Sequence, residues 1–329
     1  MPFVKSDFWV FRITEYLRLQ KLIVAVVVAA IIFVFRNDVG YGWLWLFVPL
    51  CLCIAYLVKE VIPYTVLGFK EVIDTKVKKA DASFKIFSAN VLMSNDDYGR
   101  MLEQISSEDP DIIFLLEAGR DWDAATTILK DKYPYSLKEP IDNTYGLLFY
   151  SRLKIKDASV NYIVASDVPS IELTIILPNG TEVKAYGLHP KPPVPYEASH
   201  STEKDKELMK VALTIKDRMD PCIVFGDLND VAWSDTTELF RDISGMLDPR
   251  LGRGFYTTFS AKSLIMRFPL DYLFASPHFS LIQMKKMPAN GSDHFAMSIS
   301  LQFEEGNPSK RKKPPTKEQK EKAIEKAQA

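Results

Sequence analysis

The sequence predicts a mixed α/β fold (α+β) in which two packed β-sheets are flanked by helices and preceded by a hairpin of two apolar helices. Many strand-like apolar runs and a few longer helical patterns lie between residues 81 and 303, as in such a sandwich. Two longer uncharged runs lie within residues 1–80, and Lys and Glu dominate residues 304–329. We therefore expect a membrane anchor, a globular domain of about 220 residues and a charged, flexible tail, in that order.

The two apolar runs of the N-terminal region predict transmembrane helices at about 20–36 and 40–58. The second run is about twenty residues long, which is enough to cross the hydrocarbon layer. The first is about fourteen residues long, so it can span the layer only if the side chains of Lys21 and Arg36 at its ends extend to the membrane surface. Because that run is short and Pro49 lies in the second, a hairpin lying in the membrane interface is the alternative.

The distribution of basic residues predicts the orientation of this anchor. Lys and Arg precede the first run and follow the second, whereas the short connection holds only Arg36 and Asp38 as charged residues. An even number of spans places both ends of the chain on one side, and the basic excess identifies that side as the cytoplasm. We therefore expect a multi-pass protein of the inner or plasma membrane whose globular domain faces the cytoplasm. The three cysteines offer no disulfide framework, which agrees with a reducing compartment.

Within 81–303 the apolar periodicity predicts a series of strands and helices. The strands are expected near 84–90, 111–117, 145–151, 159–164, 171–177, 182–189, 222–227, 270–275, 281–286 and 295–303. The helices are expected near 97–107, 121–131, 201–219 and 235–243. Pro178-Asn179-Gly180 is typical of a hairpin turn between two of these strands.

Polar residues stand at the ends of six of these strands, where the apolar runs stop. They are Asn90, Glu117, His189, the Asp227-Leu228-Asn229 stretch, Asp271 and the Ser292-Asp293-His294 stretch. Taken singly, each has a structural explanation such as an Asx turn or a helix start. Together they predict one polar centre, because strand ends have no general need for Asn, Asp, Glu or His. A carboxylate there can orient or deprotonate a water, and an amide beside it can bind a phosphate oxygen.

The motifs around these residues resemble the endonuclease/exonuclease/phosphatase superfamily, which includes DNase I, exonuclease III, neutral sphingomyelinases and inositol polyphosphate 5-phosphatases. They occur in the family's order as Ser88-Ala89-Asn90-Val91, Leu115-Leu116-Glu117, Gly187-Leu188-His189, Gly226-Asp227-Leu228-Asn229, Leu270-Asp271-Tyr272-Leu273-Phe274 and Ser292-Asp293-His294. The resemblance covers roughly residues 83–303 and implies a four-layered α/β/β/α sandwich of the DNase I-like type. Segments such as 189–193 and 231–234 are similar to a bacterial, membrane-anchored branch of this family.

The resemblance implies a site for a divalent cation, Mg²⁺ or Mn²⁺. Glu117 would be its main ligand, and Asn90 and Asp293 would help to place the metal or a water. Oxygen ligands of this kind suit hard ions. Nuclease members often carry an acidic residue two positions after this asparagine, where the chain has Leu92. A second metal position that depends on that side chain is therefore in doubt.

The resemblance also implies the residues that act on the phosphate. Asp227 would orient or deprotonate the attacking water, and Asn229 would bind a phosphoryl oxygen. His294, polarised by Asp271, would hydrogen-bond the phosphate or assist the leaving group. His189 would contact the phosphate from the other side.

The charge distribution helps to separate the classes of function. Charges of +4 on residues 1–80 and +3 on residues 304–329 leave −8 on the domain between them, given a total of −1. This acidic balance disfavours tight binding to long duplex DNA. The first hypothesis is therefore a membrane-anchored phosphoesterase that acts on a lipid headgroup or another small phosphoester at the lipid bilayer. A membrane-tethered endo- or exonuclease acting on DNA or RNA is the alternative, and a catalytically silent binding module is the third; no protein partner is expected.

Overall fold

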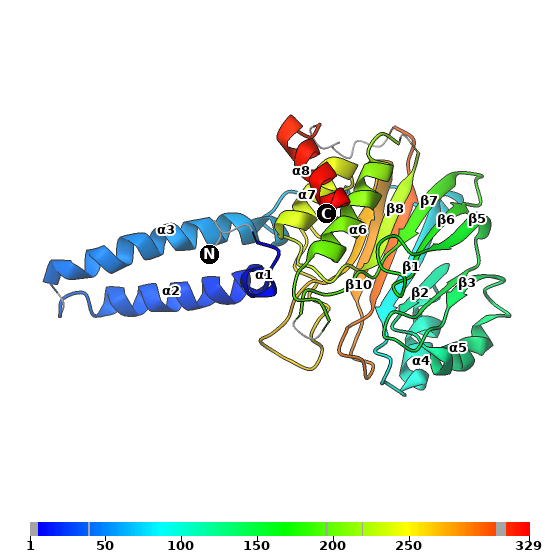
Figure 1. Cartoon of the computed structure of the whole chain (residues 1–329), viewed down its shortest axis with the longest axis horizontal. Helices are drawn as coiled ribbons and strands as arrows, with labels where there is room; N and C mark the ends of the chain where they lie inside the picture. The colour runs from blue at the N-terminus through cyan, green and yellow to red at the C-terminus, as the bar shows by residue number, and fades with distance from the viewer. Residues whose placement is uncertain (1–5, 39, 195–196, 219, 307–313) are drawn as a thin grey trace.

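The computed structural model of the chain describes residues 6–38, 40–194, 197–218, 220–306 and 314–329. Two β-sheets pack face to face, helices cover their outer faces, and a pair of helices projects from one end of the body (Figure 1). The two-sheet α/β sandwich of the DNase I-like type, which the sequence predicts, is confirmed.

The first sheet has six strands in the order β10-β11-β1-β2-β4-β3. Their bounds are β1 (Ser83–Asn90), β2 (Ile112–Leu116), β3 (Tyr135–Glu139), β4 (Leu147–Ser151), β10 (Phe279–Lys286) and β11 (Met297–Phe303). Strands β1 and β2 are parallel, and the other neighbours are antiparallel. The carboxyl ends of β1 and β2 therefore lie at the same edge of the sheet.

The second sheet has five strands in chain order. Their bounds are β5 (Lys154–Asn161), β6 (Ser170–Ile176), β7 (Glu182–Gly187), β8 (Cys222–Asp227) and β9 (Asp271–Ala275). Strands β7 and β8 are the parallel pair of this sheet. Antiparallel pairing with β9 sets Asp227 opposite Asp271.

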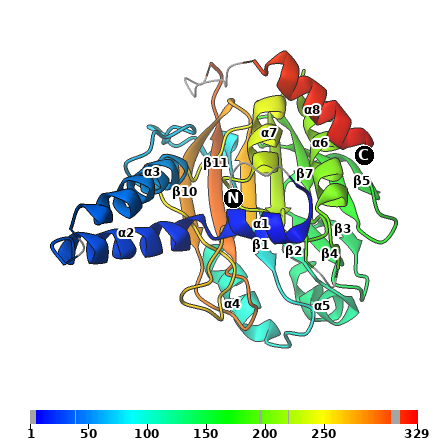
Figure 2. The same cartoon turned by 60° about the vertical axis from the view of Figure 1, so that its left-hand side comes forward.

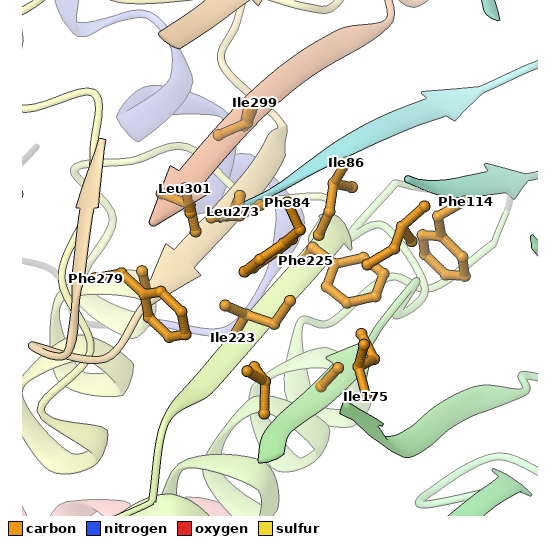
Figure 3. Packing of buried hydrophobic residues seen from close by; sticks show 14 of the residues in the cluster. Phe84, Ile86, Phe114, Ile175, Ile223, Phe225, Leu273, Phe279, Ile299 and Leu301 are labelled. Atoms are coloured by element: carbon orange, nitrogen blue, oxygen red, sulfur yellow. The ribbon is translucent and has the colours of Figure 1, made fainter. Parts of the chain in front are cut away.

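Alternation along the strands divides the apolar side chains between two faces. Phe84 and Ile86 of β1 meet Ile223 and Phe225 of β8 in the buried layer between the sheets, as Figure 3 shows. Phe87, on the opposite face of β1, packs beneath the outer helices. Complete burial of one such Phe side chain stabilises the fold by about 1.5–3 kcal/mol.

Helices cover the outer face of each sheet. Their bounds are α4 (Tyr98–Glu108) and α5 (Arg120–Ala125) on the first sheet, and α6 (Thr202–Ile215) and α7 (Asp235–Ser244) on the second. A further helix, α8 (Lys317–Gln328), lies on α6 and α7. The start of α7 is capped by Ser234, whose side chain accepts a hydrogen bond from Thr237 N. Gly245 ends that helix with φ of 70°, a conformation that favours glycine.

Three helices precede the body: α1 (Trp9–Tyr16), α2 (Arg18–Val34) and α3 (Trp43–Val61). Helices α2 and α3 lie side by side and extend away from the sandwich in both views (Figures 1 and 2). The segment Gly40–Tyr64 is long and apolar enough to cross a membrane, and α1 and α2 pass the same test only as a pair bent by 66°. The transmembrane character of the hairpin stays a prediction.

The structure differs from the predicted elements mainly at the edges of the sheets. Strand β3 was not expected, and β5 begins at Lys154 although a strand was expected near 159–164. Both are edge strands with many exposed polar side chains, so they lack the apolar run that marks a central strand. The helix expected near 121–131 divides into α5 and a 3₁₀ turn over Thr126–Leu129.

The C-terminal region differs from the expected flexible tail over 304–329. Residues of this region form α8, which packs against α6 and α7. Ala323 is fully buried in that contact, and Gln319 donates a hydrogen bond to Asp242 at 2.7 Å. The apolar face of α8 is narrow and consists of small residues, Ala323 and Ala327. The sequence pattern of this helix is therefore dominated by its charged residues and does not indicate a buried face.

Candidate active site

The predicted polar residues converge at one edge of the sandwich because the strands that carry them end there. Asn90 closes β1 and Glu117 follows β2, while Asp227 closes β8 of the facing sheet. The backbone just after two of these strands is strained, because Glu117 and Asn229 have φ of 55° and 49°. Such left-handed conformations of non-glycine residues cluster at functional sites.

The side chain of Asn90 joins the two sheets. Its Nδ2 lies 2.7 Å from Glu117 Oε1 and 3.2 Å from Asp227 Oδ2, so one amide bridges two carboxylates. Ser292 supports the same residue from behind, because its hydroxyl donates to the Asn90 carbonyl at 2.8 Å. The Ser292 hydroxyl also accepts from His294 N at 3.0 Å, which fixes the loop that carries the histidine.

His294 lies between two buried carboxylates. Its Nδ1 is 2.9 Å from Asp271 Oδ2 and its Nε2 is 3.5 Å from Asp227 Oδ2. Burial alone would lower the pKa of His294, but the Coulomb attraction of Asp271 and Asp227 outweighs it and raises the pKa to about 10. Burial raises the pKa of Asp227 to about 7, although His294 opposes that rise. The histidine is therefore an imidazolium at neutral pH and can donate a proton or a hydrogen bond.

His189 has the opposite character. It is buried, and its Nδ1 has no hydrogen-bond partner among the described residues. Burial, followed by repulsion from the charged His294, lowers the pKa of His189 to about 3. The ring of Tyr145 lies beside it at a centroid distance of 5.3 Å. One site thus holds a charged and a neutral histidine. Because their pKa values are shifted in opposite directions, the two side chains are suited to different chemical roles.

Asn229 links the loop after β8 to the loop that carries His189. Its backbone N donates to Asp227 Oδ1 at 2.9 Å, and its Nδ2 donates to Pro190 O at 2.9 Å. All the predicted side chains from Asn90 to His294 are thereby joined by direct contacts or by electrostatic effects. Asp293 belongs to the group through its charge, which raises the pKa of both Glu117 and His294.

The chemistry of these donors fits a hard divalent cation. Burial raises the pKa of Glu117, and the charge of the nearby Asp293 raises it further, so a cation held between the two carboxylates would relieve their repulsion. Ligand atoms of Asp227, Asp271 and His294 also lie within 4.8 Å of one another. That second group is less suited to a metal, because an imidazolium has no lone pair to donate. The oxygen donors of Glu117, Asn90 and Asp293 are the better fit.

Three tyrosine hydroxyls, which the sequence did not indicate, hold the backbone of the loop after β8. Tyr16 donates to Asn229 O at 2.6 Å, Tyr272 to Asp230 O at 2.8 Å, and Tyr64 to Ala232 O at 2.6 Å. Two of these tyrosines come from outside the sandwich, from α1 and from the turn after α3. Because the acceptors are backbone atoms distant in sequence, no local pattern marks the donors.

A buried ion network joins both ends of the described chain to this loop. Asp205 of α6 accepts from Arg12 Nη2 at 2.6 Å and from Lys326 Nζ at 2.5 Å. Its neighbour Lys204 pairs with Asp230, which follows Asn229 in the active-site loop. Helices α1 and α8 are therefore attached to the sandwich as well as being flanking segments. A cavity of about 970 Å³ lies beside the network, between α1, α3 and α8 and apart from the predicted site.

Comparison with known proteins places this geometry in a family. The model of the endonuclease/exonuclease/phosphatase family matches residues 87–294. TDP2 of D. rerio, solved in a complex with single strand DNA product, is 17% identical over 68% of this chain and 100% of that chain, with a TM-score of 0.57. The catalytic domain of human Nocturnin with bound sulfate is 17% identical over 71% of this chain and 98% of that chain, with a TM-score of 0.56.

A bacterial structure gives the same result. The endonuclease/exonuclease/phosphatase from Bacteroides vulgatus is 14% identical over 68% of this chain and 99% of that chain, with a TM-score of 0.55. At these identities the likeness shows a shared fold, and no curated protein matches the chain. Members of the matched family are hydrolases that act on phosphoester bonds. Since the family model covers more than half of its residues, the chain belongs to the endonuclease/exonuclease/phosphatase family.

Proposed function

We propose that this protein is a membrane-anchored, divalent-metal-dependent phosphoester hydrolase. The observation that carries the proposal is the buried Asp271–His294–Asp227 arrangement beside the oxygen donors of Glu117. It sets a proton donor, a proton acceptor and a candidate cation site within one small centre. A binding module has no need for all three, which weighs against a catalytically silent protein.

The chain's own residues divide the work as follows. Asp227 orients the attacking water and accepts its proton, since a carboxylate with a pKa near 7 is matched to that task. His294 donates from Nε2 to the phosphate or to the leaving oxygen, and Asp271 keeps the imidazolium charged and oriented. Asn229 binds a phosphoryl oxygen. His189, neutral and with an unpaired Nδ1, contacts the phosphate from the opposite side.

Glu117, Asn90 and Asp293 would hold Mg²⁺ or Mn²⁺. When bound, such an ion neutralises negative charge that develops on the phosphoryl oxygens. Asn90 donates a hydrogen bond to Glu117 at 2.7 Å and so offsets part of the negative charge of that carboxylate.

The exposed apolar surface of α2 and α3 supports membrane attachment. Most of their Val, Ile, Leu and Phe side chains are exposed, and water is a poor solvent for a surface of this kind. Two spans with the domain in the cytoplasm are the proposed arrangement, and the lipid bilayer is the partner. The substrate is a small phosphoester or lipid headgroup close to that bilayer, where tethering raises the effective concentration.

A nuclease is the second candidate function. It is favoured by the likeness to D. rerio TDP2, whose structure holds a single strand DNA product. The net charge of −8 on residues 81–303 weighs against duplex DNA but leaves short single strands as substrates.

The test uses the full-length chain in lipid nanodiscs with Mg²⁺, Mn²⁺ or EDTA. Substrates are bis(p-nitrophenyl) phosphate, phospholipids, single-stranded DNA or RNA, and plasmid DNA. We expect metal-dependent turnover that Asp227→Asn lowers by about 10²–10⁴-fold, the usual contribution of a general base. Asp157→Asn, at an exposed position of β5, is the control and retains activity. Absence of metal-dependent turnover on every substrate would instead support a silent binding module.

A further inference from the structure

A loop beside the active site exposes three consecutive apolar side chains. It comprises Ala261–Arg267 and lies between Phe259 and Phe268, whose backbones pair. Leu264 is 87% exposed, Ile265 is 75% exposed and Met266 is 42% exposed. Soluble surfaces rarely present a run of this kind, so the exposure calls for a partner.

The position of the loop indicates which partner that is. Gln20, in the first turn of α2, donates a hydrogen bond from Nε2 to Ile265 O at 3.0 Å. Figure 1 shows the loop extending from the body to the side where α2 and α3 emerge. Its apolar tip therefore lies at the base of these two helices, which expose many apolar side chains of their own. The exposed Leu67 and Phe69 lie just after α3, at the same end of the body.

Three cations lie in or near this loop. Lys262 and Arg267 flank it in sequence, and Lys286 approaches from β10. Arg267 and Lys286 lie over the ring of Phe295, at 5.2 and 4.5 Å from its centroid. Within the described part of the chain, none of the three cations forms an ion pair with a carboxylate. Arg267 and Lys286 donate instead to backbone carbonyls, those of Ser263 and Thr257. Apolar side chains beside cations that lack a carboxylate partner suit an anionic lipid surface.

The loop is also attached to the catalytic residues. Ala261 N donates to Asp293 O at 2.6 Å, and Phe259 forms a backbone bridge with His294. The rings of Phe259 and His294 are 4.9 Å apart. A surface that holds Leu264 and Ile265 would therefore lie next to the loop that carries His294.

We propose that Leu264, Ile265 and Met266 insert into an anionic leaflet, and that the substrate is the phosphoester of a phospholipid in that leaflet. Lys262, Arg267 and Lys286 then lie among the lipid phosphates. Inserted in this way, the loop holds the rim of the active site against the headgroup layer. The substrate part of the inference rests on the proposed phosphoester hydrolase, whereas insertion of the loop does not.

Insertion is tested with an environment-sensitive dye. In the full-length chain the exposed Cys51 and Cys53 are changed to Ser, and the buried Cys222 is kept. The dye NBD is attached to Ile265→Cys or, as a matched control, to Ile128→Cys, which is 73% exposed at the 3₁₀ turn after α5. In vesicles of phosphatidylcholine and phosphatidylglycerol we expect emission at shorter wavelength and quenching by nitroxide lipids at position 265, and neither at 128. Equal emission and equal quenching at the two positions would overturn the inference.

The substrate class is tested with the double variant Leu264→Ser, Ile265→Ser and the control Ile128→Ser. We expect turnover of phospholipid in these vesicles to fall by about tenfold in the double variant, because the site loses its hold on the surface. Turnover of the water-soluble bis(p-nitrophenyl) phosphate should not change. An equal effect on both substrates, or no effect on either, would count against the inference.

The two proposals fail in different ways. If the wild-type protein cleaves bis(p-nitrophenyl) phosphate or single-stranded DNA but no phospholipid, the hydrolase stands and the lipid substrate is wrong. If it cleaves none of them, the hydrolase itself is wrong. The dye still decides whether the loop inserts, since that measurement requires no turnover.

Discussion

Replacing Tyr16 with Phe removes one hydroxyl group from α1 and tests whether this helix positions the active-site loop. The hydroxyl donates to Asn229 O at 2.6 Å, and Asn229 has a left-handed backbone with φ of 49°. The ring contact between Tyr16 and Phe268, at 5.5 Å between centroids, is kept by the substituted ring. The variant thus removes the hydrogen bond and little else.

The expected effect on turnover follows from the hydrogen bond that is lost. A partly buried carbonyl left without its donor costs about 1–3 kcal/mol. A left-handed conformation at a residue other than glycine costs about 1–2 kcal/mol, so the loop can relax when its support is removed. If displacement of Asn229 raises the activation free energy by a similar amount, turnover falls by about tenfold to a hundredfold, at about 1.4 kcal/mol per factor of ten. Tyr16 is a positioning residue in this account, because it acts through Asn229.

The assay measures kcat and KM of the full-length chain for bis(p-nitrophenyl) phosphate, together with the midpoint of thermal unfolding. Tyr133→Phe is the control, since its hydroxyl donates to Pro110 O at 2.8 Å just before β2 and also accepts from Arg152 Nη2 at 3.1 Å. Both variants should lose stability, and Tyr16→Phe alone should lose kcat. Equal kcat values for the two variants would refute the positioning role of Tyr16.

Two further predictions concern pH. Asp271→Asn removes the main attraction that raises the pKa of His294 to about 10, so the pKa falls and the alkaline limb of the pH–kcat/KM profile should move to lower pH; an unmoved limb would show that His294 is not the proton donor. Burial raises the pKa of Glu207 in α6 to about 8, and its Oε1 has no partner among the described residues. The neutral side chain favours the folded state, and this contribution to the free energy of unfolding is complete below pH 4.5, the ordinary pKa of a glutamate. It falls by up to about 5 kcal/mol as the pH rises from 4.5 through 8. Glu207→Gln should therefore gain stability over the wild type in urea unfolding at pH 9 but not at pH 4, and an equal gain at both would contradict this assignment.

The sequence predicts the active site better than it predicts the parts that support it. Asn90, Asp227 and Asp271 each interrupt or border an apolar run, so their polarity is visible against a strand pattern. Tyr16 carries no such signal, because its partner is a backbone carbonyl 213 positions away. Residues 1–80 are expected as a separate anchor, yet Arg12 and Tyr16 bind the body directly.

The same physical reason explains the elements that were missed. Central strands such as β2 are buried on both faces and read as continuous apolar runs. Edge strand β3 has one exposed side and an ordinary mixture of polar residues. Helix α8 buries only small side chains, and the burial of Ala323 depends on α6 and α7, which no local pattern of 317–328 can show.

The joint attachment of Arg12 and Lys326 to Asp205 has a consequence for biosynthesis. Arg12 leaves the ribosome about three hundred positions before Lys326, so Asp205 has its first cation partner available while α8 is still untranslated. A nascent chain that ends after β11 carries every predicted active-site residue but lacks the last cation beside Asp205. We therefore expect maturation to be completed only when α8 docks.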